Sequence, residues 1–229
     1  MTSRKRKHDR MYIFLIFLVL LIVLYGFSAR SLVEQLILDL IVVSLFVSVV
    51  FTLEQTKRSL LVSIMLGIPW IVAVFVDLFV VQGRTMRLLT TVAGIPFLIF
   101  VTRVVFWHVL RSRRVTPSAI YGAICVYLLL GIVWAAGYRF LEALNPGSFS
   151  GPMGIDPETG LELPNYMYFS FTTLTTLGYG DIVPVTAVAR SVAIIEAIAG
   201  PLYITILISQ LVSKYVSRKV EDEIDDIQK

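Results

Sequence analysis

The sequence is poor in the residues that form disulfides and metal sites. Its 229 residues include one cysteine and two histidines. The single Cys125 excludes an intrachain disulfide, and its place inside an apolar block is typical of a small core residue. His8 and His108 are too far apart in the sequence to suggest a site. Because no metal-ligand cluster, nucleophile elbow or phosphate loop occurs, we expect that the protein is not an enzyme.

Charged residues are also scarce, at 16% of the chain, whereas soluble proteins carry about 25%. The net charge of +4 does not indicate a nucleic-acid partner, because the basic residues sit in short flanks between apolar blocks. Apolar residues make up 57% of the chain, and they form blocks close to the ~20 residues that cross a bilayer. We therefore predict an all-α integral membrane protein in contact with lipid, with spans at Met11–Phe27, Leu36–Leu53, Leu60–Val81, Leu88–Leu110, Ala119–Leu141 and Ala187–Val212.

The distribution of basic residues predicts the orientation of these spans. Fourteen Lys and Arg residues fall on the side of the termini and four on the other side, as counted along the sequence. The positive-inside rule then places both termini in the cytoplasm and the polar segment 142–165 outside. The basic start and the first block also match the layout of a signal peptide, with Ser28-Ala29 as the cleavage site. Five further spans favour a retained first span.

A short helical run precedes the last span. Tyr166–Thr175 follows Pro164 and the N-cap candidate Asn165. At 1.5 Å per residue it is roughly 15 Å long, too short to cross the bilayer. Such a segment enters the membrane and stops, with the backbone after it buried in protein or lining water. If it enters from outside, the partial negative charge of its C-terminal end favours a cation at the membrane centre.

The segment after this run is Thr175-Thr176-Leu177-Gly178-Tyr179-Gly180-Asp181. Gly178 and Gly180 adopt positive φ at no steric cost, so alternating them with other residues lets successive carbonyls point the same way. Four copies around an axis would form stacked rings of oxygens that replace the hydration shell of a cation. The segment resembles the selectivity filter of the potassium channels, Thr-Val-Gly-Tyr-Gly followed by Asp. Leu177 replaces the valine, and its side chain should point away from the ion path.

The resemblance implies a homotetrameric channel that conducts K⁺ passively, with K⁺ as the permeant ion and no cofactor. It implies ion binding along Thr176–Gly180, with K⁺ held at Thr176, Leu177, Gly178 and Tyr179. Asp181 and Thr175 would support the filter. Glu196 would either face the cavity or bond to threonine hydroxyls behind the filter, and we favour the second. Gly200 and Pro201 would form a gating hinge, although a fixed kink is also compatible with this pair.

The layout is similar to that of six-span, voltage-gated-like channels with a prokaryotic-type pore. We predict a four-helix transmembrane bundle followed by a two-helix pore domain with a re-entrant pore helix and filter. The predicted divisions are 1–10, the cytoplasmic N-terminus; 11–116, the voltage-sensor-like bundle; 117–216, the pore domain; and 217–229, a short cytoplasmic tail. The apolar spacing in the tail fits either a short helical bundle or a frayed acidic end. The location would be the plasma membrane, as a prokaryotic inner membrane.

The fourth span has few of the charges that sense voltage. Arg84 and Arg87 are in register, but Thr90, Ala93 and Pro96 follow where further charges should lie. Each charge that crosses the field contributes about 2.3 kcal/mol per 100 mV. We therefore expect weak or no voltage dependence. The charges instead suggest ion pairs inside the bundle, between Arg84, Arg87, Asp39 and Asp77 at one depth and between Glu54 and Arg103 at another.

Three alternatives stay open. Leu177 is compatible with a cation channel of low selectivity. An ion-coupled secondary transporter would use Asp77, Glu196 and Arg103 as a relay, although such proteins have two related halves and this chain has one re-entrant loop. A non-conducting membrane subunit is the third.

Overall fold

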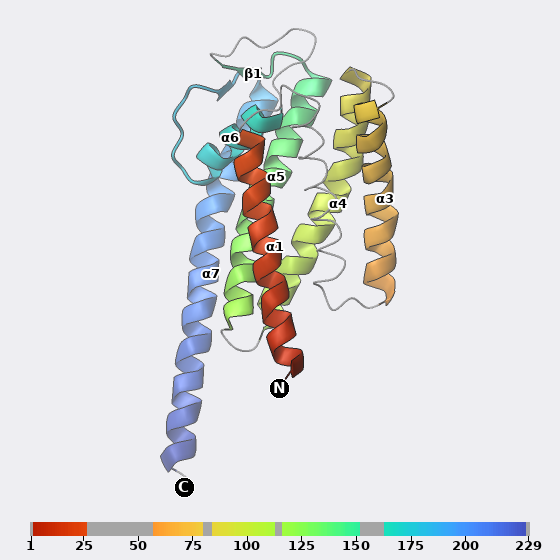
Figure 1. Cartoon of the computed structure of the whole chain (residues 1–229). Coiled ribbons are helices and arrows are strands. Elements are labelled where there is room, and N and C mark those ends of the chain that lie inside the picture. The colour runs from red at the N-terminus through yellow and green to blue at the C-terminus, as the bar shows by residue number, and fades with distance from the viewer. Residues whose placement is uncertain (1, 27–56, 80–83, 113–115, 152–162, 228–229) are drawn as a thin grey trace.

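The computed structural model describes residues 2–26, 57–79, 84–112, 116–151 and 163–227. The predicted span 36–53 lies outside them. The structure is helical, with one small pair of strands (Figure 1). Its elements are α1 (Thr2–Gly26), α3 (Lys57–Phe79), α4 (Arg84–Arg111), α5 (Pro117–Leu144), β1 (Phe149–Ser150), α6 (Leu163–Leu174), β2 (Val183–Pro184) and α7 (Ala187–Ile227).

Three of the described helices are long and apolar enough to cross a membrane. These stretches are Leu88–Arg111 in α4, Pro117–Leu144 in α5 and Ala187–Lys214 in α7. Shorter apolar stretches occupy α1 and α3, at Met11–Leu24 and Leu61–Asp77. The prediction of a helical protein with membrane-spanning segments is confirmed at this level, whereas the full number of crossings stays a prediction.

Helix α7 is longer than the predicted span. It continues past Val212 and ends at Ile227, without an interruption at the expected boundary between residues 216 and 217. The described part of the acidic tail is therefore helical, and α7 extends well beyond the other helices at the end of the molecule where both termini lie (Figure 1).

Helix α5 begins where the sequence predicted a break in the chain. Thr116 is its N-cap, with an extended backbone, and the Thr116 hydroxyl accepts a hydrogen bond from Ala119 N at 3.2 Å. Pro117 occupies the first turn, where its missing N–H leaves no bond unmade. The N-cap Thr116 was not predicted, although threonine directly before proline is a recognisable start signal.

Helix α5 is the centre of the packing. It contacts α1, α4, α6 and α7. Gly122 of α5 marks a point of close approach, because a Cβ there would lie 2.9 Å from both Met11 Cε of α1 and Val109 Cγ2 of α4. The fully buried Cys125 is a core residue, as predicted. The same core includes Phe14, Leu18, Phe97, Val101, Val105, Val126, Leu129, Tyr138, Phe149, Tyr166 and Phe169.

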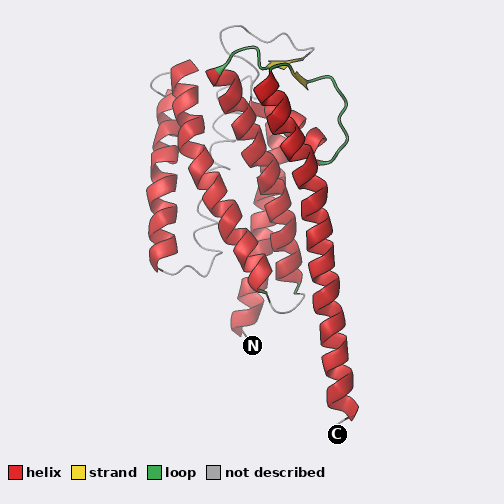
Figure 2. Cartoon of the chain, turned by 180° about the vertical axis from the view of Figure 1, so that it is seen from behind, coloured by secondary structure: helices red, strands yellow, loops and turns green. Residues whose placement is uncertain are grey.

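The two strands close the end of the molecule opposite the termini (Figures 1 and 2). They pair antiparallel, with Phe149 opposite Pro184 and Ser150 opposite Val183. The buried carboxyl group of Glu142, in the last turn of α5, accepts hydrogen bonds from Gly147 N at 2.7 Å and Phe149 N at 3.1 Å. This carboxyl group therefore fixes the turn that leads from α5 into β1.

Candidate functional site

The re-entrant helix is α6, Leu163–Leu174. It starts three residues before the predicted Tyr166, so the prediction that Asn165 is the N-cap is wrong. Pro164 lies in the first turn, where proline is tolerated because the N–H groups there have no helical partner. With 12 residues the helix is about 18 Å long, which is still too short to cross a bilayer.

The end of α6 is tied to the loop that follows it. Leu177 N and Gly178 N both donate to the Thr172 carbonyl, at 2.9 and 3.0 Å. Thr175 N donates to the Phe171 carbonyl at 3.1 Å. These bonds satisfy carbonyl groups that a helix end leaves without an intrahelical partner, and they hold the start of the loop directly over the C-terminal end of α6.

The backbone φ angle of the loop alternates in sign from residue to residue. Within the loop, positive φ values occur at Thr176 (61°), Gly178 (53°) and Gly180 (79°), that is, at every second residue. Glycine adopts this conformation without strain. For the β-branched Thr176 it is an outlier, and its N–H is held by the Thr173 carbonyl at 3.0 Å. The sequence analysis expected positive φ at the two glycines and did not foresee it at Thr176.

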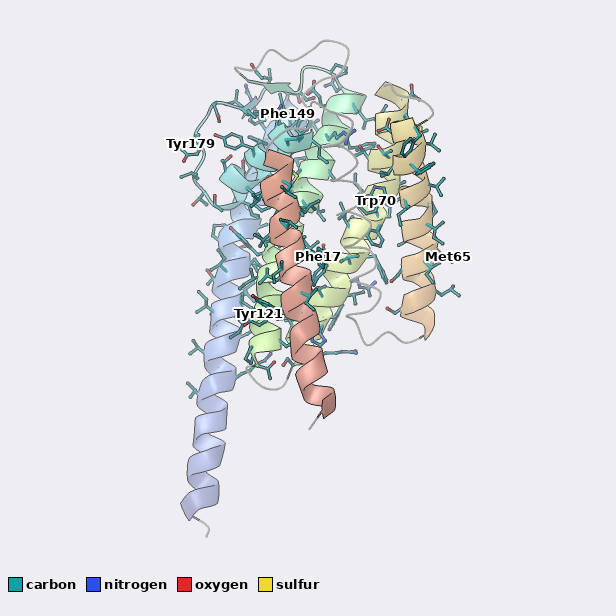
Figure 3. The ribbon with its side chains drawn as sticks, in the orientation of Figure 1. Phe17, Met65, Trp70, Tyr121, Phe149 and Tyr179 are labelled. Atoms are coloured by element: carbon teal, nitrogen blue, oxygen red, sulfur yellow. The ribbon has the colours of Figure 1, made fainter. Side chains whose placement is uncertain are left out.

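The predicted filter residues are exposed. Every residue from Thr175 to Gly180 is exposed, and the exposed fractions of Leu177 and Tyr179 are 56% and 67%. Figure 3 shows Tyr179 on the loop, outside the helices. Apolar and aromatic side chains that are exposed together mark surfaces that another molecule or subunit can cover. The single chain therefore presents the loop rather than enclosing it.

Asp181 has a partner on α6 that the sequence analysis missed. One of its carboxylate oxygens accepts a hydrogen bond from the Tyr168 hydroxyl at 2.7 Å, and the other accepts from Ile182 N at 3.0 Å. The ring of Tyr168 also lies parallel to that of Tyr179, with 6.3 Å between centroids and 3° between planes. Tyr168 thus links α6 to both ends of the Tyr179–Asp181 segment.

Glu196 lies behind α6, fully buried on α7. Its Oε1 is 2.5 Å from Ser170 Oγ of α6, and its Oε2 accepts a hydrogen bond from the Tyr138 hydroxyl of α5. The expected threonine partners are not used. The hydroxyls of Thr172, Thr173 and Thr175 bond to carbonyls of Phe169 and Phe171 in their own helix. The side chain thus joins three helices at a point one turn from the end of α6.

Gly200 contacts the end of α6 more closely than any other residue type would permit. A Cβ on Gly200 would lie 2.0 Å from the Leu174 carbonyl oxygen. The same oxygen accepts a hydrogen bond from the Tyr127 hydroxyl of α5 at 3.3 Å. Pro201 follows inside an uninterrupted α7. The glycine that the sequence suggested as a hinge is therefore also a packing position.

An aromatic cluster supports α6 from behind. The rings of Tyr138, Phe149, Tyr166 and Phe169 meet edge to face, with centroids 5.0 to 5.6 Å apart. This geometry is favourable for aromatic pairs. Phe149 belongs to β1 and lies near the upper part of α6 in Figure 3. The cluster was not identified from the sequence, because its members come from three separate segments.

The charges expected to pair in the first four spans are only partly described. Arg84 begins α4 and Arg87 lies in its first turn. Asp77 is half-buried on α3, whereas Arg103 is exposed on α4. Asp39 and Glu54 lie outside the described residues, as do the side chains of Arg84 and Arg87. The predicted ion pairs stay predictions.

Two further bonds fix α7 below the site. The Tyr203 hydroxyl donates to the Ala123 carbonyl of α5 at 2.7 Å. Lys214 Nζ donates to the Leu110 carbonyl at 3.3 Å. Leu110 is in the last turn of α4, where carbonyls lack helical partners and the helix dipole favours a positive charge. This contact joins the first part of the chain to α7 and was not predicted.

Comparison with known proteins places this site in a family context. Residues 124–217, which contain most of α5, all of α6 and the loop, match the family model of ion channels. A protein of Rhodopseudomonas palustris named "Putative potassium channel protein" is 38% identical over 52 residues, which are 23% of this chain and 13% of that relative. The chain thus corresponds to a small part of that relative. No solved structure matches. Residues 124–217 are therefore similar to an ion channel domain, the apolar helices support a multi-pass membrane protein, and the resemblance to the potassium channel family is confirmed.

Proposed function

We propose that the chain is a potassium-selective channel that conducts K⁺ passively through four copies of the Thr176–Gly180 loop. The observation that carries the proposal is the alternation of positive φ at Thr176, Gly178 and Gly180. An alternating backbone turns successive carbonyls toward one side, which is what a column of oxygen rings requires. Backbone strain at a β-branched residue such as Thr176 also supports a functional constraint.

The position of the loop supports the same function. It starts at the C-terminal end of α6, whose dipole places partial negative charge there. The carbonyl bonds to Thr172 and Phe171 hold the loop at this end. In the proposed channel the K⁺ ions are bound by backbone oxygens of Thr176, Leu177, Gly178 and Tyr179. Asp181 braces the outer mouth through Tyr168, and Thr175 and Glu196 support the loop from the inner side.

A homotetramer accounts for the surfaces that the single chain leaves uncovered. Only 17% of the apolar stretch of α7 is buried, whereas 56% of the apolar stretch of α5 is buried. Large side chains such as Ile194, Ile198 and Leu202 are more than half exposed. Four subunits with α7 innermost would cover part of this surface and bring the four loops to one axis. Both termini would then be cytoplasmic, in the inner membrane of a prokaryote.

The gating mode that we propose is weak or absent voltage dependence. It follows from the small number of basic residues in α4, where Arg84 and Arg87 are followed by Thr90. Gly200 and Pro201 stay the proposed position at which α7 bends to open the inner end.

The test is the current through purified protein in planar bilayers, with K⁺ on one side and Na⁺ on the other. The current is expected to reverse near the K⁺ equilibrium potential, and the fraction of open channels is expected to depend little on voltage. Reversal near zero would identify a cation channel of low selectivity, and Leu177→Val would then show whether Leu177 is the cause. The absence of any current under every condition, together with no K⁺-dependent change in thermal stability, would contradict the proposal.

A further inference from the structure

Glu196 belongs to a group of three close oxygen–oxygen contacts. If Glu196 is an ionised carboxylate, there are too few hydrogens for all three to be hydrogen bonds. Ser170 Oγ lies 2.8 Å from the Gly131 carbonyl oxygen and 2.5 Å from Glu196 Oε1. Tyr138 OH contacts Oε2 of the same carboxyl group. The two serine contacts are within the range of full O–H···O hydrogen bonds, and the Tyr138 contact is closer still. Each of them therefore needs one hydrogen.

Two hydroxyl groups provide two hydrogens for these three contacts. The carbonyl of Gly131 only accepts, and a serine hydroxyl donates once. If Ser170 donates to Glu196, its oxygen faces the Gly131 carbonyl without a hydrogen between them. If Ser170 donates to Gly131, its oxygen faces Oε1 in the same way. A carboxylate thus leaves one pair of acceptors in contact in a fully buried site, where unpaired polar groups are costly.

One additional proton on Glu196 completes the set. With the proton on Oε1, Glu196 donates to Ser170, Ser170 donates to Gly131, and Tyr138 donates to Oε2. The proton does not fit on Oε2, because the hydroxyl of Tyr138 would then lose the acceptor that the structure gives it. Each of the three contacts has its own hydrogen only in this arrangement.

In the described part of the chain, no positive charge is found to act on the Glu196 carboxyl group. Among the described residues, the titratable groups that act on Glu196 are Tyr138 and, through space, Tyr127, both on α5. Helix α6 contributes the hydroxyl of Ser170, and no basic side chain acts on the carboxyl group. Transfer of an unpaired carboxylate into such a site is unfavourable.

We propose that Glu196 is held as a neutral carboxylic acid and that its proton is the central link of a hydrogen-bonded chain joining α5, α7 and α6. The series of hydrogen bonds begins at Tyr138 on α5, which donates to Glu196 on α7. Glu196 donates to Ser170 on α6, and Ser170 donates to the Gly131 carbonyl, again on α5. Loss of the proton leaves the Ser170 hydroxyl between two acceptors with one hydrogen to donate. The contact between α7 and α6 is then weakened.

The joint lies where it can affect conduction. Glu196 is one helical turn from Gly200, which packs on the end of α6 at Leu174, and the proposed filter begins there. In its consequence for current the inference rests on the proposed function. Within that function we expect the open-channel current to change when alkaline pH removes this proton, and to lose that change in Glu196→Gln.

Infrared spectroscopy of the full chain in lipid vesicles tests the protonation directly. We expect the carbonyl stretch of a protonated carboxylic acid at neutral pH, absent from Glu196→Gln. Ser170→Ala removes the acceptor of the proton and Tyr138→Phe removes the donor to Oε2, so each should shift the frequency of this band. Glu142→Gln is the matched control. Glu142 is also buried, but its two oxygens have two N–H donors, so it needs no proton and its replacement should leave the band unchanged.

A spectrum with no band that depends on Glu196 at neutral pH would overturn the proposal, as would a band that neither Ser170→Ala nor Tyr138→Phe shifts. Thermal stability provides a second measurement. A carboxyl group that stays protonated in the folded state, while it ionises in the unfolded state, makes the free energy of unfolding fall as pH rises. The stability of the wild type should fall more steeply than that of Glu196→Gln as pH rises above the pKa of an unfolded glutamic acid, about 4.3, and parallel profiles across this range would contradict the proposed link. Neither measurement requires current, so a non-conducting protein would count against the proposed channel and leave this inference testable.

Discussion

Replacement of Gly200 by alanine separates two roles for this residue. A Cβ at position 200 would lie 2.0 Å from the Leu174 carbonyl oxygen. Carbon and oxygen in close contact are about 3.3 Å apart, so α7 and the end of α6 must separate by about 1.3 Å. The obstacle is backbone at the end of a helix and cannot rotate away. Overpacking of this kind costs typically 1–3 kcal/mol, and a rigid obstacle places Gly200→Ala near the upper value.

Helix propensity acts in the opposite direction. Alanine is favoured over glycine in a helix interior by about 1 kcal/mol. We therefore expect Gly200→Ala to lower the free energy of unfolding by about 2 kcal/mol per chain, the difference between these two terms. Gly137 in α5 is the matched control, because a Cβ there meets no atom within 4 Å. Gly137→Ala should stabilise by about 1 kcal/mol.

The assay is thermal or denaturant unfolding of both variants in detergent, followed by K⁺ current from the same preparations. If Gly200 served only as a hinge, its contact with the Leu174 carbonyl would not matter for stability. The higher helix propensity of alanine would then stabilise both variants. A Gly200→Ala protein as stable as Gly137→Ala would therefore refute the packing argument. Loss of current alone would not separate the two roles, because both predict it.

Three other substitutions test separate parts of the structure. Gly178→Ala places a side chain at φ 53°, which costs about 1–2 kcal/mol; we expect no K⁺ current but an assembled protein by size-exclusion chromatography, and robust K⁺ current would defeat the filter assignment. Thr116→Ala removes the N-cap of α5 and should destabilise by about 1 kcal/mol, with Thr116→Ser as the control that keeps the cap. Glu142→Ala leaves the N–H groups of Gly147 and Phe149 without their acceptor; Gly147 is exposed to water, but the buried Phe149 N–H should cost about 1–3 kcal/mol, and a wild-type melting temperature would contradict the role assigned to this carboxyl group.

Features encoded in short stretches were predictable from the sequence. The apolar blocks of α5 and α7 are long and uninterrupted, so their length and composition alone indicated membrane spans. The glycines of the loop indicated positive φ because only glycine adopts it without strain. Pro164 was misjudged because proline marks the end of one helix and the first turn of another equally well.

Contacts between distant segments were beyond the sequence. Glu196 was recognisable as a buried ionisable group in need of a partner, but its partners Ser170 and Tyr138 are 26 and 58 residues away. Serine was harder to select than the four nearby threonines, because nothing local shows which hydroxyl faces α7. In the same way Gly200 suggested flexibility, while its contact with Leu174 depends on how two helices meet.

Helix α7 is attached to the rest of the chain at two points, by the contact of Gly200 with α6 and by the bond between Lys214 and the end of α4. Fourteen residues separate Gly200 from Lys214, so at 1.5 Å per residue the arm is about 21 Å long. A rotation of only about 10° at Gly200 would move Lys214 by roughly 4 Å, more than a hydrogen bond of 3.3 Å tolerates. The lower half of α7 therefore cannot swing outward unless it releases the Leu110 carbonyl or draws the end of α4 along with it. A movement of α4 therefore has a direct route to the C-terminal part of α7 through this bond, besides the route through α5.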